Sequence, residues 1–212
     1  MEVLYRDNDL VVCIKPAGIL SAADLSGAEN LPDKIKEDLG VSEVFPIHRL
    51  DREVSGLMVY ALNKKSAADL SAQAADHTKF IKEYIAFVEG FPEEESGVFE
   101  DLLFKDSSKN KTYVVKRERM GVKKAKLSYN VLERRDSGTI VRVKLYTGRT
   151  HQIRVQFASR KMPILGDRKY GGSEAKCGIS LYSVALSFTH PVNRQTLTFE
   201  KLPDNLFGER II

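Results

Sequence analysis

Apolar residues fall into short runs along the chain, and the spacing within each run predicts the local structure. Residues 10–15 (LVVCIK) and 57–62 (LMVYAL) are continuous apolar runs of strand length, and Pro16 and Gly18 stop the first one. Apolar and polar positions alternate in residues 82–90 (KEYIAFVEG), which also predicts a strand. Further strands are predicted for residues 111–116, 126–135, 139–147, 179–190 and 195–202.

Helical spacing occurs in fewer places. Residues 31–39 (LPDKIKEDL) carry leucine or isoleucine at every fourth position, which predicts an amphipathic helix that ends at Gly40. Residues 65–77 are rich in alanine and predict a second helix, with Ser66 as its N-terminal cap.

A third, short helix is predicted for residues 150–160 (THQIRVQFASR), with Thr150 as its cap. Ile153 and Phe157 share one face of this helix, and Arg154 lies beside that apolar face. The helix therefore carries a cation close to the core.

The predicted strands and helices follow one another irregularly, without the strict alternation of a doubly wound fold. This order favours the α+β class, with a mixed, mostly antiparallel central sheet flanked by helices and loops. The only linker-like passage, residues 91–97 (FPEEESG), is more typical of a loop than of a domain boundary. We therefore expect a single domain over residues 1–212.

The composition suits a soluble protein with a sizeable core, since 42% of the residues are hydrophobic and 29% are charged. No apolar run is long enough to cross a bilayer, and the N-terminus is not a signal peptide, so no membrane is expected. Cys13 and Cys177 are then expected to be free thiols in a reducing cytoplasm.

Positive charge is concentrated in two stretches, although the net charge is only +4. Residues 105–126 hold nine Lys or Arg against two acidic residues, and residues 142–169 hold eight against Asp167 alone. Such stretches suit a surface that binds a polyanion. The same charges could equally be spread over solvated faces, and the sequence alone leaves both interpretations open.

Motifs for nucleotides and metals are weak or missing. The chain has no Gly-rich phosphate loop, and its four histidines are too far apart for a zinc site. His48 and Asp51 could share a metal ion, and Ser55, His151 and Asp51 could form a catalytic triad on paper. The triad lacks the turn that would expose the serine, and no metal is predicted.

The remaining candidate chemistry lies in two segments, PIHRLDREVSG (46–56) and TGRTHQIR (147–154). If Arg154 faced Asp51, the carboxylate would stay ionised while partly buried, which suits a nucleophile or a base. A buried Asp–Arg pair that only joins two elements explains the same residues. Residue patterns alone favour that second interpretation.

The first segment resembles the catalytic motif H-R-L-D-x-x-T-S-G-L of the RluA-type pseudouridine synthases, and the second matches the family's T-G-R-T-H-Q-I-R motif residue for residue. The resemblance extends over residues 5–204. Other blocks similar to those of the family follow in the expected order: LVVCIKPAGILS, KEYIAFVEG, KDSSKNKTYVV, KKAKLSYNVLE, ILGDRKYGG and LSFTHPV. Val54, Gln156 and residues 181–183 depart from the family's patterns, which puts in doubt the fit to a substrate and not the chemistry.

The resemblance implies the pseudouridine synthase fold in a stand-alone catalytic domain without an S4-type RNA-binding domain. It implies that uridine in RNA is isomerised to pseudouridine, with Asp51 as the nucleophile that attacks the base or the ribose, or that assists ribose deprotonation. Arg154 would pair with Asp51, and Tyr84 would stack on the target base and help to move its proton. Judged without the family, Tyr84 would be a core tyrosine.

The resemblance also implies residues that bind the substrate. Arg49 would fill the space that the base leaves or hold a phosphate, although it could instead pair with Glu53. His48 would orient the loop, and Ile153 would pack beside the base. Further substrate-binding candidates are Arg149, His151 and Gln152. Phosphate contacts are expected among the basic residues Lys109, Lys111, Lys123, Lys124, Arg149 and Lys169.

No cofactor is expected, because the isomerisation involves no redox change. The expected partner is rRNA or tRNA, bound by a cytoplasmic monomer that needs no protein partner. The alternative is a catalytically inactive protein on the same fold that binds or remodels RNA. The presence of Asp51, Tyr84 and Arg154 together favours the enzyme. A metal-dependent hydrolase using His48 and Asp51 is a remote third option.

Overall fold

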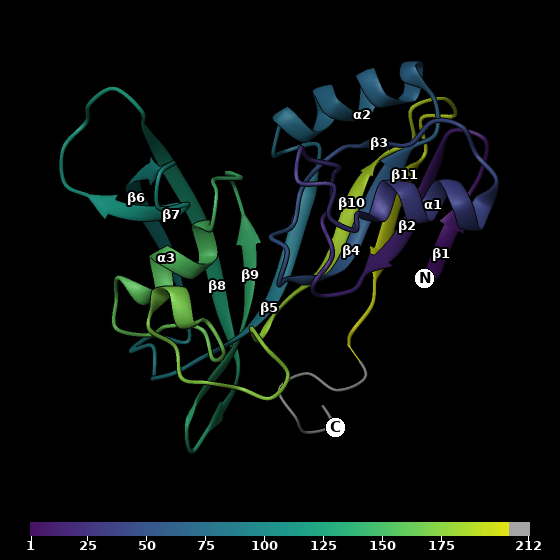
Figure 1. Cartoon of the computed structure of the whole chain (residues 1–212). Coiled ribbons are helices and arrows are strands. Elements are labelled where there is room, and N and C mark those ends of the chain that lie inside the picture. Colours follow the sequence, from purple (N-terminus) through teal and green to yellow (C-terminus); the bar gives the residue numbers. More distant parts are fainter. Residues whose placement is uncertain (204–212) are drawn as a thin grey trace. The chain divides into compact units, whose positions relative to one another are not determined.

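The computed structural model describes residues 1–203 and divides this part of the chain into two compact units (Figure 1). The first unit combines residues 1–82 with residues 182–203, and the second comprises residues 83–181.

The first unit is built on a sheet whose strands are β1 (Val3–Arg6), β2 (Leu10–Lys15), β3 (Phe45–Pro46), β4 (Ser55–Ala61), β10 (Leu181–Thr189) and β11 (Thr196–Glu200). The strand order is β1-β2-β4-β10-β11. Strand β10 pairs with the first two residues of β4, whereas β3 pairs with its last two. Only the short β4–β10 ladder is parallel, while the other pairings in this unit are antiparallel. Leu10, Leu57 and Phe188 bury one face of this sheet in a shared core.

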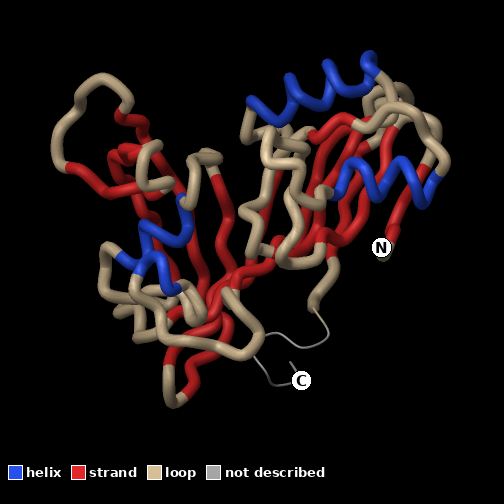
Figure 2. The backbone as a smooth tube through the Cα atoms, viewed as in Figure 1, coloured by secondary structure: helices blue, strands red, loops and turns tan. Residues whose placement is uncertain are grey.

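Two helices accompany this sheet, α1 (Leu31–Leu39) and α2 (Lys64–Ala75), both coloured blue in Figure 2. Helix α1 begins after Asn30 and ends at Gly40, which adopts the left-handed conformation, as the sequence predicts. Helix α2 begins at Lys64, one residue before its predicted start, because Asn63 is its cap and accepts a hydrogen bond from the Ser66 amide. Ser66 itself is therefore not the cap.

The second unit is an antiparallel sheet in the order β5-β9-β8-β6-β7. Its strands are β5 (Ile81–Val88), β6 (Ser96–Asp106), β7 (Lys111–Val115), β8 (Val122–Arg135) and β9 (Gly138–Leu145). A short helix, α3 (Gln152–Ala158), packs on this sheet and is followed by the 3-10 turn η1 (Arg168–Tyr170). The Phe157 ring of α3 lies 5.0 Å from the Phe99 ring of β6 and 5.9 Å from the Tyr129 ring of β8.

The expected fold class is confirmed: sheets that are mostly antiparallel and three α-helices make up the described residues. The strands β1, β3 and β6 are not among the predicted ones. The acidic loop ends at Glu95, and β6 follows at once, because it is paired on both of its sides, with β7 and with β8. Thr150 is not a cap either, since His151 precedes α3 with a φ of 53° and no side-chain cap.

None of the helices within residues 1–203 is long and apolar enough to cross a bilayer.

Candidate active site

Asp51 lies in the loop between β3 and β4, in the first unit. Leu50 and Val54 are buried on either side of it, while the Asp51 side chain is only partly covered. Arg49 and Glu53 are exposed. The loop thus inserts its apolar residues into the core and holds one carboxylate at the boundary between core and solvent.

Lys15, at the end of β2, fastens this loop. Its side chain is fully buried, and its Nζ donates hydrogen bonds to the carbonyl oxygens of Pro16 (2.8 Å), Ile19 (2.9 Å) and Arg52 (3.0 Å). An ammonium group has three protons, so these oxygens satisfy it completely. The hydrogen bond to the Arg52 carbonyl joins the end of β2 to the residue that follows Asp51.

Three further hydrogen bonds join the turn after β2 to the same loop. The Gly18 amide donates to the Arg52 carbonyl (2.9 Å), and Arg52 Nε donates back to the Gly18 carbonyl (2.7 Å). Ser21 Oγ donates to the Leu50 carbonyl (2.9 Å). No role is predicted from the sequence for Lys15, Ser21 or Arg52, although Lys15 and Ser21 belong to the segment LVVCIKPAGILS, which resembles a block of the family.

Lys15 is also an electrostatic neighbour of Asp51. Burial lowers the pKa of Lys15 to about 8, and the negative charges of Glu53 and Asp51 oppose that shift. Lys15 therefore remains mainly cationic at neutral pH.

His48 anchors the start of the loop. Its Nε2 accepts a hydrogen bond from the Val59 amide of β4 (3.3 Å), so the proton of the neutral ring is on Nδ1. Burial, together with the charge of Lys82, lowers the pKa of His48 to about 3. A ring that stays neutral suits the predicted role in orienting the loop better than a role in proton transfer.

Gly56 closes the loop where β4 begins. Its φ is +120°, and a Cβ at this position would lie 2.4 Å from the Ser183 carbonyl oxygen of β10. Ser183 in turn donates a hydrogen bond from Oγ to the Leu57 carbonyl (3.1 Å). Only glycine allows the parallel strands β4 and β10 to approach this closely.

The other predicted residues lie in the second unit, where Gln152 organises the TGRT turn. Its Oε1 accepts hydrogen bonds from the Arg149 amide (3.0 Å) and from Thr147 Oγ1 (2.7 Å). Its Nε2 donates to the Lys126 carbonyl of β8 (3.1 Å). Arg149 Nε donates to the Lys124 carbonyl (2.9 Å). Gln152 is buried and holds the turn on β8, which places the Arg149 side chain beside that strand.

Arg154, on α3, forms a buried bidentate ion pair with Asp167. Arg154 Nε lies 2.7 Å from one carboxylate oxygen and Nη2 lies 2.8 Å from the other, and both side chains are buried. The guanidinium also lies 5.3 Å from the centre of the Tyr170 ring. Asp167 was not predicted as a site residue. The pairing of Arg154 with Asp51 stays a prediction, because the two residues belong to different units.

Tyr170 connects the Arg154 region to His151. The Tyr170 hydroxyl accepts a hydrogen bond from the Thr112 amide (2.8 Å) and lies 2.9 Å from His151 Nδ1. His151 is buried and has a left-handed backbone, which sets the sharp entry into α3. These contacts give His151 a structural place in the turn.

Tyr84 and Ile153 are both buried in the second unit, 5% and 4% exposed. Tyr84 lies on β5, opposite Val143 of β9. The structure therefore places Tyr84 on a rigid, paired strand, the setting in which an aromatic ring can be held at a fixed angle.

The candidate phosphate-binding residues all belong to the second unit. Lys109, Lys123, Lys124 and Lys169 are exposed, and Lys111 is half-buried. Lys169 Nζ donates to the Asn110 carbonyl (3.1 Å), which brings η1 to the turn between β6 and β7. Hydrogen bonds thus join Lys169 to this turn and Arg149 to β8, so the basic stretches partly converge.

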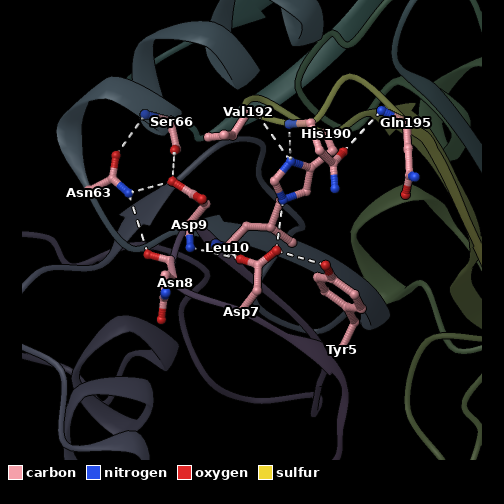
Figure 3. A network of polar contacts seen from close by, with 11 residues as sticks. Tyr5, Asp7, Asn8, Asp9, Leu10, Asn63, Ser66, His190, Val192 and Gln195 are labelled. Atoms are coloured by element: carbon pink, nitrogen blue, oxygen red, sulfur yellow. Dashed lines mark hydrogen bonds and ion pairs between the residues drawn. The ribbon is translucent and has the colours of Figure 1, made fainter.

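A separate polar cluster in the first unit was not predicted (Figure 3). Asp7, Asp9 and His190 bring their ligand atoms within 4.8 Å of one another. Each Asp7 oxygen already accepts two hydrogen bonds, Oδ1 from the Asp9 and Leu10 amides and Oδ2 from Tyr5 and His190. Burial favours a higher pKa for Asp7, but these hydrogen bonds hold it below the usual value. The cluster joins the β1–β2 turn to the turn after β10.

Comparison with known proteins places these features in a family. A family model described as RNA pseudouridylate synthase matches residues 9–159, which include Asp51, Tyr84 and Arg154. The chain is 32% identical to a Haemophilus ducreyi protein named tRNA pseudouridine synthase C, over 96% of this chain and 91% of that protein. It is also 32% identical to the Haemophilus influenzae dual-specificity RNA pseudouridine synthase RluA, over 96% and 94% of the two chains.

Solved structures agree with this assignment. The human RNA pseudouridylate synthase domain containing 4 aligns with a TM-score of 0.76 and 26% identity, over 95% of this chain and 88% of that one. A second human protein, RNA pseudouridylate synthase domain containing 1, aligns with a TM-score of 0.77 at 21% identity, which supports the fold alone. The chain therefore belongs to the RNA pseudouridine synthase family and is an RluA-type isomerase.

Proposed function

We propose that this enzyme converts specific uridines of structured rRNA or tRNA to pseudouridine, with Asp51 as its nucleophile and both units acting as one catalytic domain. The observation that carries the proposal is the way in which the Asp51 loop is held by hydrogen bonds. The loop around it is fastened by Lys15, Gly18 and Ser21 through main-chain oxygens. A carboxylate held in place near a buried cation is oriented for attack before the substrate arrives.

The reaction rearranges one nucleotide without adding or removing atoms. The bond between N1 and C1′ breaks, the uracil turns, and C5 forms a new bond to C1′. The proton on C5 is then lost, and N1 gains one. Asp51 attacks the base or the ribose, or assists loss of a ribose proton, and Tyr84 stacks on the base and relays the C5 proton. No cofactor is required, because no electrons are gained or lost.

Arg154 supports the charge of the Asp51 carboxylate in this proposal. Its bidentate pair with Asp167 fixes the plane of the guanidinium, so that a second carboxylate can be met without reordering the side chain. Ile153 packs beside the base, while Arg49, which is exposed on the Asp51 loop, occupies the space that the flipped base leaves.

The names of relatives support structured RNA as the substrate. They include a tRNA pseudouridine synthase, a dual-specificity RNA pseudouridine synthase and a ribosomal large subunit pseudouridine synthase. The basic residues of the second unit, including Lys109, Lys123 and Lys124, suit contacts to the phosphates of such an RNA. We further propose that the enzyme works as a monomer in the cytoplasm.

Asp51→Asn tests the proposed nucleophile. The substitution keeps the shape of the side chain and removes its charge, so turnover should fall at least about 1,000-fold while RNA binding is retained. The measurement is tritium release from RNA labelled at C5 of uridine, combined with a binding assay. Glu53→Gln, a change in an exposed carboxylate of the same loop, is the matched control and should keep turnover. Turnover near the wild-type level in Asp51→Asn would refute the role.

Mapping of pseudouridine in all cellular RNA, with and without the gene, would identify the target. Loss of a mark at one or a few uridines is the expected result. If no mark changes and the purified protein releases no tritium, the alternative of an inactive RNA-binding protein replaces the proposal.

A further inference from the structure

Tyr146 is an exposed aromatic residue on the face of the second unit's sheet opposite to α3. Phe99 and Tyr129 pack against Phe157 of α3, and side chains alternate between the two faces of a strand. The neighbours of Phe99 and Tyr129 along β6 and β8 therefore point to the other face. On that face Val98 is 56% exposed, and Tyr146, which follows β9, is 38% exposed.

The Tyr146 ring is held in place by contacts with β8. Its main-chain amide donates to the Lys126 carbonyl (3.0 Å), which continues the pairing of β9 with β8. Its hydroxyl accepts a hydrogen bond from Ser128 Oγ (3.3 Å). The ring is thus oriented before any partner arrives, which lowers the entropic cost of binding.

Lys126 and Lys144 place their ammonium groups beside this ring. The two Nζ atoms lie 5.8 Å and 5.7 Å from the ring centre. Glu100 pairs with Lys126 (2.6 Å), and Glu83, which lies opposite Lys144, pairs with Arg142 (2.6 Å). These three cations outnumber the two carboxylates, so the surroundings of the ring carry an excess of positive charge.

An oriented, exposed ring with cations beside it suits an unpaired nucleotide, whose base is aromatic and whose phosphate is negative. RNA-binding domains that present a sheet face to RNA stack unpaired bases on aromatic side chains in this way. Base stacking is stronger than a cation–π contact at an exposed site, so a base can displace the lysines from the ring. Val98 lies opposite Ser128 and adds exposed apolar surface on the same face.

The position of Tyr146 fits an RNA that also reaches the TGRT turn. Tyr146 directly precedes Thr147, the first residue of that turn. Arg149 of the turn donates to the Lys124 carbonyl, two residues before Lys126 on β8. An RNA strand that contacts Arg149 can therefore continue to Tyr146 along the same unit.

We propose that Tyr146, flanked by Lys126 and Lys144, stacks on an unpaired base of the substrate RNA that lies outside the target uridine. We call these three residues the Tyr146 platform. This inference rests on the proposed function, because it takes RNA as the substrate. Stacking accepts every base, so the platform selects unpaired over paired RNA and reads no sequence.

The first test compares RNA binding by the wild type, Tyr146→Leu and Tyr146→Phe. The probe is bulk RNA from cells that lack the gene, labelled with tritium at C5 of uridine. Tyr146→Leu should bind about 5- to 150-fold more weakly, and Tyr146→Phe, which keeps the ring, within about twofold of the wild type. The matched control is Phe91→Leu, because Phe91 is a 54% exposed aromatic residue of the same unit beside the glutamates 93–95. It should bind like the wild type.

The salt dependence of binding separates the ring from its lysines. A stacked ring releases no counterions, so Tyr146→Leu should keep the slope of log K against log salt. Lys144→Met removes a cation and should reduce that slope by about 0.7, the share of one phosphate contact on a single strand.

A second test observes the stacking directly. The chain contains no tryptophan, so Tyr146→Trp introduces a single fluorescent reporter on the platform. Bulk RNA should quench its emission, because a base stacks on the indole. Polyphosphate, a polyanion without bases, and fully paired RNA should not quench it. Phe91→Trp is the control and should stay unquenched with every probe.

Each outcome bears on one claim. The platform is overturned if Tyr146→Leu binds RNA like Phe91→Leu, if Tyr146→Phe fails to restore binding, or if polyphosphate or paired RNA quenches Tyr146→Trp as strongly as bulk RNA does. In any of these cases tritium release by the wild type would leave the proposed activity standing. If the variants differ as expected but the wild type releases no tritium, the proposed activity fails while the platform stands.

Discussion

At the scale of single residues, Lys15 determines how firmly Asp51 is held. Lys15→Met would leave the Pro16 and Ile19 carbonyls without this donor, since only the Arg52 carbonyl keeps a second one from Gly18. Unsatisfied buried acceptors cost about 1–3 kcal/mol each, partly offset by removal of a buried charge.

We therefore expect Lys15→Met to lower kcat at least about tenfold and to reduce stability by about 1–3 kcal/mol. Tritium release and urea unfolding measure the two effects. Lys34→Met, which removes an exposed lysine paired with Glu29 on the same unit, should change neither. An unaltered kcat in Lys15→Met would show that the loop does not depend on this clamp.

His48 makes stability depend on pH in a predictable direction. Its pKa is about 3 in the folded protein and 6.5 in the unfolded chain, so between these values the unfolded state binds one proton more. The free energy of unfolding should fall by about 1.4 kcal/mol for each pH unit below 6.5 from this residue alone.

A His48→Gln variant lacks this titration. The free energy of unfolding, measured in urea between pH 7 and pH 4, should therefore decrease less steeply in His48→Gln than in the wild type. Equal slopes for the two proteins would mean that His48 is not neutral in the folded state.

At the scale of elements, the approach of β4 to β10 depends on Gly56. Its φ of +120° disfavours any other residue, and a Cβ would meet main-chain atoms of Ser183 at 2.4 Å and 2.5 Å. Backbone atoms cannot rotate away as the end of a side chain can. The start of β4 would therefore have to move, and with it the loop that carries Asp51.

Gly56→Ala is expected to destabilise the protein by about 2–3 kcal/mol and to reduce turnover together with stability. Gly18→Ala is a useful comparison, because Gly18 also has a positive φ but no atom within 4 Å of the added methyl group. A smaller loss of stability in Gly18→Ala than in Gly56→Ala would show that the close approach of Ser183 adds to the backbone strain that both positions share. Equal losses would contradict the steric argument.

At the scale of the whole molecule, the elements could be predicted where local pattern and burial agree. Strand β2 and helix α1 follow their apolar periods and their stop signals. Strand β6 was missed, because its apolar residues follow no regular period and its pairing with β7 and β8 is not visible in the sequence. The cap of α2 was misplaced by three residues, since Asn63 and Ser66 are both good caps and only geometry decides between them.

The candidate site was predictable only in part. Asp51, Tyr84 and Arg154 are predicted from motifs, and their catalytic roles stay predictions. Asp167 was not predicted, because the partner of an arginine is set by how α3 packs against a distant turn. Lys15 was missed for a similar reason, since its partners are main-chain oxygens that leave no trace in side-chain patterns.

That use of main-chain oxygens has an evolutionary consequence. Lys15 and Ser21 hold the Asp51 loop through its main chain, so exposed residues such as Arg49 can be substituted while the Asp51 carboxylate keeps its position. The catalytic residue and the residues that select the RNA target can then evolve separately within one short loop. Such a division would allow a family to acquire new RNA targets by surface substitutions alone.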